Sequence, residues 1–370
     1  MISSVGMAAA ALVMTGCDAP ACSDTLRLAG PPIAVGSAPS KVAVGELTGD
    51  AHADLLVASS DDGTLILLAG DGSGRLERAE TIPAGEHPVD VAIGDLDGDG
   101  DLDAAIANHE TDYLTLLSNR GTGNFVPFAS SPLHVELGPH PHAVLLADAD
   151  GDGVLDLFVD DRRGEAILFL RGTGGAGFSA DGRRISVGGD PYRGMVLADL
   201  DGDGGLDVVT PNPDRAAVTL TLPEGGYAPA AGVPADRPFE VALGDMNGDG
   251  LLDLVIAEEP GRVLVHVGRG DGSFDLAPWF EHRWAAGAKA VAVGDIDGDG
   301  IADAAATNWN SRSALVLIGG REGIDGHEVE AGDNPWGVTI GDLTADGRDE
   351  LLLLDNTGGT LRVYTWTSSE

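Results

Sequence analysis

One acidic loop recurs seven times along this chain of 370 residues, at intervals of about fifty residues. Its full form reads D-x-D-x-D-G-x-x-D. The seven copies begin at Glu46, Asp95, Asp148, Asp199, Asp245, Asp295 and Asp342. Self-similarity with a period of about 20 to 50 residues is typical of solenoids, propellers and other repeat architectures. The repeat therefore constrains the fold more strongly than the length of the chain does.

Each repeat contains short apolar runs separated by glycine-rich turns. In the second repeat, residues 91–94 lead into the acidic loop, 102–107 leave it, and 114–117 follow a polar turn. A glycine turn at 121–125 then precedes a last, irregular run. Short runs rich in Val, Ile and Leu between such turns indicate β-strands. Four strands per unit, repeated radially, predict one propeller blade per repeat.

The two ends of the repeat array predict how the ring closes. The last repeat stops after its third strand, near residues 361–366, whereas the segment 25–35 precedes the first loop and resembles a fourth strand. Donating that segment to the last blade would pair an otherwise bare strand edge. An open solenoid would instead need capping repeats. We therefore expect an all-β, seven-bladed β-propeller of four-stranded blades over residues 24–370, closed by its N-terminal strand.

The acidic loops have the composition and spacing of calcium ligands. Positions 1, 3, 5 and 9 offer side-chain oxygens and position 7 offers a backbone carbonyl, which suits a cation that takes six to eight oxygens. The glycine at position 6 permits a sharp turn. Five loops are complete, and their residues at positions 1, 3, 5, 7 and 9 are Asp95, Asp97, Asp99, Asp101 and Asp103; Asp148, Asp150, Asp152, Val154 and Asp156; Asp199, Asp201, Asp203, Gly205 and Asp207; Asp245, Asn247, Asp249, Leu251 and Asp253; and Asp295, Asp297, Asp299, Ile301 and Asp303.

The first and last loops are weaker versions of the same pattern. Their acidic positions are Glu46, Asp50 and Asp54, and Asp342, Asp346 and Glu350. An EF-hand is excluded, because position 12 of the complete loops lacks Glu and the flanking runs are β-like. Asx turns, in which the aspartates cap their own backbone, are the alternative. Because carboxylates at this density repel one another unless a cation is present, we favour calcium at about five sites, and at up to seven if the weaker loops also bind.

The repeat resembles the FG-GAP/VCBS repeat, the blade of the integrin α-subunit head and of many bacterial surface proteins. The resemblance covers residues 25 to 370 and rests on the recurring acidic loop. It implies a seven-bladed propeller with calcium between the first two strands of a blade, and adhesion or ligand binding more often than catalysis. The chain has no room for the inserted domain or leg domains of integrins, so animal-type adhesion is not implied.

Residues 1–23 are predicted to be an export signal and a short tether. The apolar run 5–14 is too short to span a bilayer. Residues 14–17 (Met-Thr-Gly-Cys) resemble a bacterial lipobox, which would make Cys17 the lipidated first residue, whereas Ala19 to Ala21 offer an ordinary cleavage site. We expect a lipoprotein in the periplasm or on the cell surface, with a secreted protein as the alternative. Cys22 is the only other cysteine, so no disulfide framework supports the fold.

The predicted strand order places the second-to-third loops and the blade connections on the face opposite the acidic loops. Converging loops on a rigid scaffold are a common binding surface. The residues selected there are His109, His140, His142, Arg162, Arg163, Arg193, Arg215, Trp309, Arg312 and Trp336. The same face is expected to hold Lys41, His87, Asp160, Asp161, Tyr192, Asn212, Arg237, Lys289 and Asn308. In the alternative interpretation, the basic side chains balance nearby carboxylates and the tryptophans pack between blades.

The formal net charge of -39 excludes nucleic acid as a partner and adsorption to anionic lipid. Membrane contact is expected only through the lipid at Cys17. The chain has no HExxH, no nucleophile elbow and no dinucleotide fingerprint in a strand–turn–helix context. We expect a monomeric, non-enzymatic module that binds calcium and a protein or glycan ligand at the cell envelope. The alternatives are a polysaccharide lyase or hydrolase and a structural scaffold of the envelope.

Overall fold

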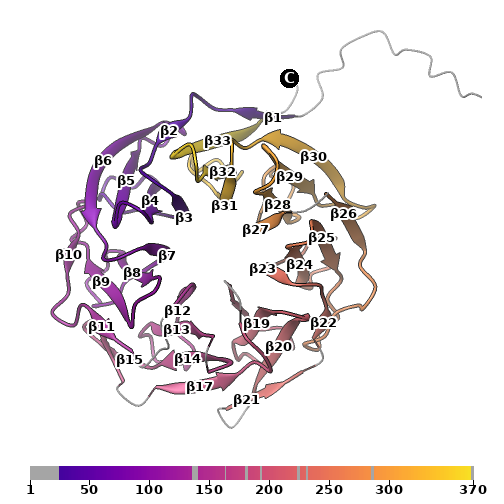
Figure 1. Cartoon of the computed structure of the whole chain (residues 1–370), viewed down its shortest axis with the longest axis horizontal. Coiled ribbons are helices and arrows are strands. Elements are labelled where there is room, and N and C mark those ends of the chain that lie inside the picture. Colours follow the sequence, from indigo (N-terminus) through magenta and orange to yellow (C-terminus); the bar gives the residue numbers. More distant parts are fainter. Residues whose placement is uncertain are drawn as a thin grey trace, which may run out of the picture.

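A computed structural model describes residues 25–135, 141–162, 164–179, 182–191, 194–222, 226–230, 232–284 and 287–367. In these ranges the regular secondary structure is entirely β, and the strands form seven blades around a ring (Figure 1). Within the same ranges there is no helix of the length and apolarity needed to cross a membrane. The prediction of an all-β, seven-bladed propeller is confirmed.

The first three blades follow one another along the chain. Blade 1 consists of β3 (Pro39–Gly45), β4 (Asp54–Ser59), β5 (Thr64–Gly70) and β6 (Leu76–Pro83). Blade 2 consists of β7 (Pro88–Gly94), β8 (Asp103–Asn108) and β9 (Tyr113–Ser118), with β10 (Val126–Pro127) and β11 (Leu133–His134) both paired to β9. Blade 3 consists of β12 (Val144–Ala147), β13 (Asp156–Asp161), β14 (Ala166–Leu170) and β17 (Arg183–Ser186), with a small hairpin of β15 (Gly172–Gly174) and β16 (Gly177–Phe178).

The next three blades repeat this antiparallel order. Blade 4 consists of β18 (Val196–Ala198), β19 (Asp207–Asn212) and β20 (Arg215–Leu222), with β21 (Gly226–Pro229) and β22 (Val233–Pro234) paired to β20. Blade 5 consists of β23 (Pro238–Gly244), β24 (Asp253–Glu258), β25 (Arg262–His266) and β26 (Phe280–Arg283). Blade 6 consists of β27 (Ala288–Gly294), β28 (Asp303–Asn308), β29 (Ser313–Ile318) and β30 (Asp325–Glu330).

Blade 7 joins the two ends of the described chain. Its first three strands are β31 (Pro335–Gly341), β32 (Glu350–Asp355) and β33 (Thr360–Thr367). The fourth place is taken by β1 (Thr25–Leu28), which pairs antiparallel with β33, and β2 (Ile33–Ala34) extends the same edge. In Figure 1 the first and last segments of the chain accordingly lie side by side. The predicted closure of the ring by the N-terminal strand is confirmed.

The core lies between neighbouring blades. The second strand of each blade is buried along its whole length, because adjoining blades cover both of its faces. This explains why these strands are continuous apolar runs rather than alternating ones. One cluster joins Leu55 and Val57 of blade 1 to Leu352 and Leu354 of blade 7, so apolar packing also closes the ring.

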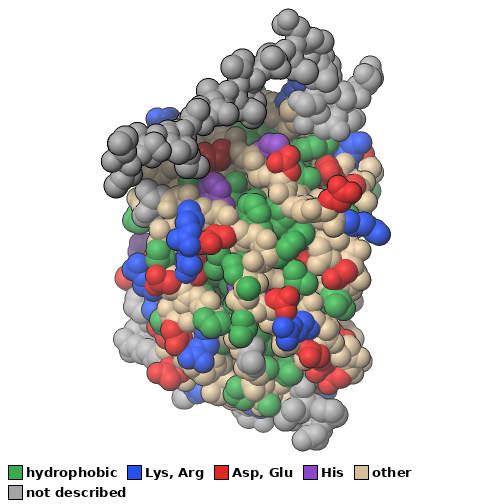
Figure 2. Space-filling model, turned by 90° about the vertical axis from the view of Figure 1, so that its right-hand side faces the viewer, with side chains coloured by type: hydrophobic (Ala, Val, Ile, Leu, Met, Phe, Trp, Pro, Cys, Tyr) green, Lys and Arg blue, Asp and Glu red, His purple; other side chains and the backbone are tan. Residues whose placement is uncertain are grey.

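The first and last residues of each second strand lie at opposite faces of the ring and repeat from blade to blade. Its first residue is always the acid at loop position 9, as in Asp54 and Glu350. Its last residue is always polar and buried, as in Asn108, whose amide donates to the carbonyl of Ala84 at 2.8 Å. The side chain of the first residue forms hydrogen bonds with the backbone of the acidic loop on one face, and that of a last residue such as Asn108 does so with the blade connection on the other face. Both satisfy backbone groups that burial removes from water. The flank between the two faces carries interspersed acidic and basic side chains (Figure 2).

Candidate functional site

Three carboxylates meet in each of four complete acidic loops. One oxygen from each of positions 1, 3 and 5 lies within 4.8 Å of the others in the loops that begin at Asp95, Asp148, Asp199 and Asp295. The residues that sequence analysis selected at these positions are therefore brought together. An all-oxygen set of this kind fits a hard divalent cation such as calcium. These acidic clusters are able to hold metal ions.

The loop backbone is organised by the same carboxylates. In the second blade, Asp95 Oδ1 accepts the N–H of Gly98 at 2.7 Å and Oδ2 accepts that of Gly100 at 3.0 Å. At positions 3 and 5, Oδ1 accepts a hydrogen bond from the backbone N–H two residues later. Asp97 Oδ1, for example, accepts the N–H of Asp99 at 3.2 Å. The Asx-turn interpretation thus describes part of each loop correctly. It does not exclude a cation, because a carboxylate oxygen can accept more than one contact.

Position 7 lies at the exit of the turn. The backbone N–H of Asp101, Val154, Gly205, Leu251 and Ile301 donates to Oδ1 of the position 5 aspartate at 2.8 to 3.0 Å. This bond fixes the peptide whose carbonyl sequence analysis selected as a ligand. In the fifth blade, Asn247 replaces the position 3 carboxylate and keeps the same bond to the N–H of Asp249 at 2.8 Å.

Position 9 differs from the other acidic positions because it is buried and accepts hydrogen bonds both from the acidic loop and from a residue at or just after the end of the third strand. Asp103 accepts the N–H groups of Leu96 and Asn119, both at 2.9 Å. Asp156, Asp253 and Asp303 repeat this pattern in their own blades. Burial raises the pKa of Asp103 to about 6 and that of Asp303 to about 7, and neighbouring carboxylates add to the effect. These carboxyls are structural bridges as well as candidate ligands.

The clustered carboxylates also affect one another. Burial raises the pKa of Asp97, and the charges of Asp99 and Asp95 raise it further. The pKa of Asp297 is raised for the same reasons, with Asp299 and Asp295 as the neighbours. A divalent cation would relieve this repulsion.

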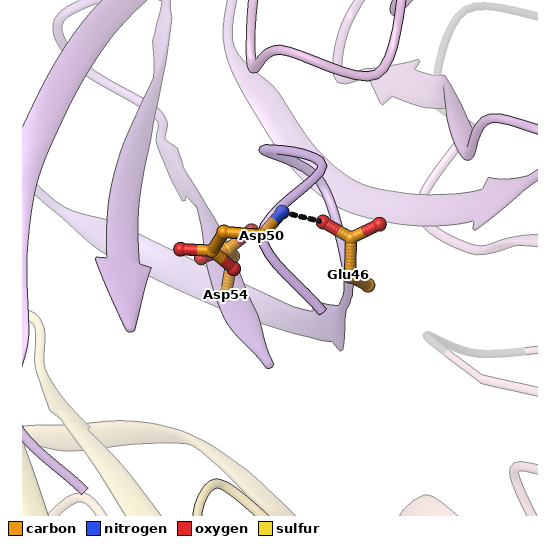
Figure 3. A group of neighbouring side chains, drawn as sticks. All are labelled: Glu46, Asp50 and Asp54. Carbon is orange, nitrogen blue, oxygen red and sulfur yellow. Dashed lines mark hydrogen bonds between the residues drawn. The ribbon is translucent and has the colours of Figure 1, made fainter. Parts of the chain in front are cut away.

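The first and last loops fold like the others but carry backbone strain. Figure 3 shows Glu46, Asp50 and Asp54, whose oxygens also lie within 4.8 Å of one another, with the N–H of Asp50 directed at Glu46. Position 6 of the first loop is Ala51 at φ 69°, and position 4 of the last is Ala345 at φ 57°. The complete loops have glycine at both places. A left-handed alanine costs about 1 to 2 kcal/mol. In the last loop, Asp342 accepts N–H bonds from Ala345 and Gly347, and burial raises the pKa of Glu350 to about 7.

The opposite face opens into the central channel. A hollow of about 150 Å³ is lined by residues from all seven blades, among them Lys41, Asp90, His142, Met195, Glu240, Ala290 and Trp336. We call this region the channel mouth. Lys41 of blade 1 donates to Glu240 of blade 5 at 3.1 Å, so an ion pair crosses the channel. Glu240 also accepts the N–H of Val291 at 3.1 Å.

Asp90 lies beside this pair and is buried. It accepts the N–H groups of Val91 and Val144, both at 3.0 Å. Burial raises the pKa of Asp90 to about 6, although the charge of Lys41 opposes the shift. The carboxylates of Glu240 and Asp90 raise the pKa of Lys41, which therefore stays charged.

Aromatic residues, two of which line the channel mouth, surround a second lysine. Lys289 Nζ lies 3.6 Å from the ring centre of Phe239, 4.9 Å from that of Trp309 and 5.4 Å from that of Trp336. It also pairs with Glu259 at 3.1 Å. Trp309 lies against this lysine and is nevertheless 41% exposed. Both tryptophans lie on the expected face.

The selected arginines that the structure describes are paired with acids. Arg162 makes two bonds of 3.1 Å to Asp190, and Arg312 lies 2.7 Å from Asp333. Arg215 is bonded to its neighbour Asp214. The cationic character expected of this face is therefore locally balanced. Four other polar residues expected on this face are buried, namely Asp160, Asp161, Asn212 and Asn308.

Of the three selected histidines, the structure describes two. The rings of His109 and His142 lie 4.7 Å apart, and His142 is buried with its Nδ1 3.6 Å from Asp160. His140, Arg163, Arg193 and the proposed lipidation site Cys17 lie outside the described residues.

Sequence analysis missed the acidic partners at the channel mouth, namely Asp90, Glu240 and Glu259. It also missed Arg171, which contacts the third acidic loop. Asp90 and Glu240 occupy the same place at the start of an inner strand in blades 2 and 5, and aligning the repeats on this strand would have revealed them.

Comparisons with known proteins agree with this architecture. A family model described as an FG-GAP-like repeat matches residues 47–106, 103–159 and 245–306. No curated protein gives a significant match. Among solved structures the chain is similar to BBS1N in complex with ARL6DN, with a TM-score of 0.66 and 15% identity over 93% of this chain and 98% of that chain.

Two further structures are similar. One is virginiamycin B lyase from Staphylococcus aureus, with a TM-score of 0.60 and 13% identity over 93% of this chain and 99% of that chain. The other is an Agrocybe aegerita lectin that recognises non-reducing terminal N-acetylglucosamine, with a TM-score of 0.52 and 18% identity over 85% of each chain. At these identities the likeness extends to the fold alone. The chain is therefore a seven-bladed β-propeller that carries FG-GAP-like repeats.

Proposed function

We propose that this protein is a calcium-stabilised, non-enzymatic binding module whose channel mouth receives a protein or glycan ligand. The observation that carries the proposal is the recurrence of three carboxylate oxygens within 4.8 Å at one blade position. Positions 1, 3 and 5 would hold the ion, with the position 7 carbonyl and the position 9 carboxylate completing the set. When bound, the ion supplies positive charge that offsets the repulsion between the carboxylates.

In this proposal, calcium and ligand act on opposite faces. The position 9 carboxylates join each acidic loop to the second strand, and the far end of that strand anchors the connections around the channel mouth. An acidic loop held rigid by calcium would therefore also stiffen the scaffold that presents Lys41, Glu240 and Trp309. Rigid presentation lowers the entropy cost of binding.

The channel mouth combines features that suit a polar ligand. It and its immediate surroundings hold an exposed tryptophan, two paired lysines and carboxylates from several blades. Aromatic rings next to hydrogen-bonding groups can bind sugars and polar protein segments. Propellers of similar fold include a lectin for terminal N-acetylglucosamine and a domain solved in complex with another protein, so both ligand classes are compatible with the scaffold.

A second candidate function is lyase or hydrolase activity. The feature that favours it is Asp90, a buried carboxyl with a pKa of about 6 in the same hollow as His142. Groups that titrate near neutral pH are suited to proton transfer. Virginiamycin B lyase has a similar fold. Release of unsaturated products from acidic polysaccharides by the wild type, and its loss in Asp90→Asn, would favour this alternative.

We further propose that the chain is exported and anchored by a lipid on Cys17, which would place the propeller at the cell envelope. Radiolabelled palmitate incorporated by the wild type and lost in Cys17→Ala would support this part of the proposal. Export of an unlipidated protein would favour cleavage at Ala19 to Ala21.

The binding proposal is tested with a glycan array and an envelope pull-down, each in calcium and in chelator. We expect a specific ligand that Trp309→Ala and Arg162→Ala weaken at least tenfold. The control is Arg269→Ala, because Arg269 is also paired with an aspartate, Asp275, but lies on the acidic-loop face. Equal loss of binding in all three variants, or no ligand under either condition, would contradict the proposal.

A further inference from the structure

Among the ion pairs of the described residues, the third acidic loop is the complete loop in which an arginine contacts the carboxylates of positions 3 and 5 directly. Arg348 acts on Asp297 in the loop of blade 6 through its charge. Arg171 directly follows β14 on the acidic-loop face. Its Nε lies 2.6 Å from Asp150 Oδ2, and its terminal nitrogen lies 2.8 Å from Asp152 Oδ2. One guanidinium therefore bridges positions 3 and 5 of the loop.

Arg171 contacts the oxygens that a cation would use. The backbone already occupies Oδ1 of both aspartates: Asp150 accepts the N–H of Asp152 at 3.3 Å, and Asp152 accepts that of Val154 at 2.9 Å. In the described contacts Oδ2 is the oxygen not committed to the loop backbone, and Arg171 binds it in both residues. These contacts raise the pKa of Arg171, and the backbone bond from Val154 together with Arg171 lowers the pKa of Asp152.

Strand register shows that the arginine is particular to this blade. In blade 3 the second residue of the second strand, Leu157, pairs with Leu170 of the third strand. Arg171 is the residue that comes directly after Leu170. The equivalent residues in the other six blades are uncharged. They are Ala69, Ser118, Leu220, Val267, Ile318 and Thr365.

We propose that Arg171 is a built-in counter-cation that neutralises the third loop and makes it the weakest calcium site among the complete loops. The inference rests on the proposed calcium function of the other loops. An incoming ion must displace two charge-assisted hydrogen bonds and meets the like charge of the guanidinium. We therefore expect calcium affinity at this loop to be at least tenfold lower than at the loops of blades 2 and 4. Blade 3 would keep its loop folded when calcium is scarce.

The test is calcium titration by calorimetry of the full chain after chelator treatment. We expect one fewer tight site in the wild type than in Arg171→Gln. The reciprocal variant is Ser118→Arg, which places an arginine at the equivalent, half-buried position of blade 2, beside the intact loop 95–103. It is expected to lose one tight site. Circular dichroism confirms that each variant is folded before titration.

A second readout separates charge neutralisation from loss of folding. In chelator, Arg171→Gln should melt below the wild type, because the third loop loses its counter-charge, and added calcium should remove the difference. An unchanged number of tight sites in both variants would overturn the role of Arg171 while leaving calcium binding intact. Absence of calcium binding in every variant would overturn the proposed function itself, and this inference with it.

Discussion

Replacing Asp54 with alanine is expected to destabilise the protein even when no divalent cation is present. Asp54 is fully buried, and its two oxygens accept the N–H groups of Leu47 at 2.8 Å and Gly70 at 2.9 Å. The alanine leaves both donors buried without an acceptor, and each such loss costs about 1 to 3 kcal/mol. We therefore expect the free energy of unfolding to fall by about 2 to 6 kcal/mol.

The matched control is Asp50→Ala in the same loop. Asp50 is exposed, and water can replace it as the acceptor of the His52 N–H. Its loss should therefore cost less than about 1 kcal/mol in chelator. The assay is urea denaturation followed by circular dichroism, with the two variants and the wild type in the same chelator buffer. Equal losses in the two variants, or a loss below about 1 kcal/mol for Asp54→Ala, would refute the role of position 9 as a structural bridge.

Two further predictions concern the channel and the closure of the ring. Because burial raises the pKa of Asp90 from 3.8 to about 6, its contribution to stability is fully present below about pH 4 and is lost as the pH rises through 6. Urea denaturation at pH 4.5 and 7 should show that the wild type loses stability between the two pH values. Asp90→Asn should lose about 2 kcal/mol less over the same interval, and an equal loss in both proteins would contradict the assignment. A truncated chain that begins at residue 36 lacks β1 and β2, which leaves the edge of β33 bare. It should melt at a lower temperature than a chain that begins at residue 24, and it alone should self-associate through this edge. Size-exclusion chromatography and thermal melting compare the two, and identical behaviour would contradict strand donation.

The blade count and the closing strand could be predicted because they depend on local patterns that repeat. Each second strand begins at the acid of position 9, as at Asp103, so the loop motif also marks the start of a strand. The segment that forms β1 and β2 was recognisable as a fourth strand because the last repeat lacked one. Irregular fourth strands were harder to predict. In blade 2 the edge is broken into β10 and β11, and in blade 3 the glycine-rich segment 172–178 forms its own hairpin of β15 and β16.

Contacts between distant residues could not be predicted from one repeat. Lys41 and Glu240 are 199 residues apart and meet only because the ring brings blades 1 and 5 to the same channel. Arg171 reaches the third loop because strand pairing places it there, which no spacing along the sequence indicates. Asp161 and Asn212 were expected on the face opposite the acidic loops because they lie in or beside the loops between the second and third strands. They are buried because nearby backbone groups need hydrogen-bond partners. Asp161 accepts the N–H of Gly164 in the turn after β13, and Asn212 donates to the carbonyl of Val187 in the connection that precedes blade 4.

The central claim, that the acidic loops need a divalent cation, is tested most directly by scanning calorimetry of the stripped protein in chelator, in magnesium and in calcium. Each occupied site contributes about 2.7 kcal/mol when the free ion is at 100 times its Kd. We predict that calcium raises the Tm by many degrees above the value in chelator, and that magnesium restores much less. The same Tm in all three buffers would contradict the account, because the carboxylate clusters would then be stable without any cation.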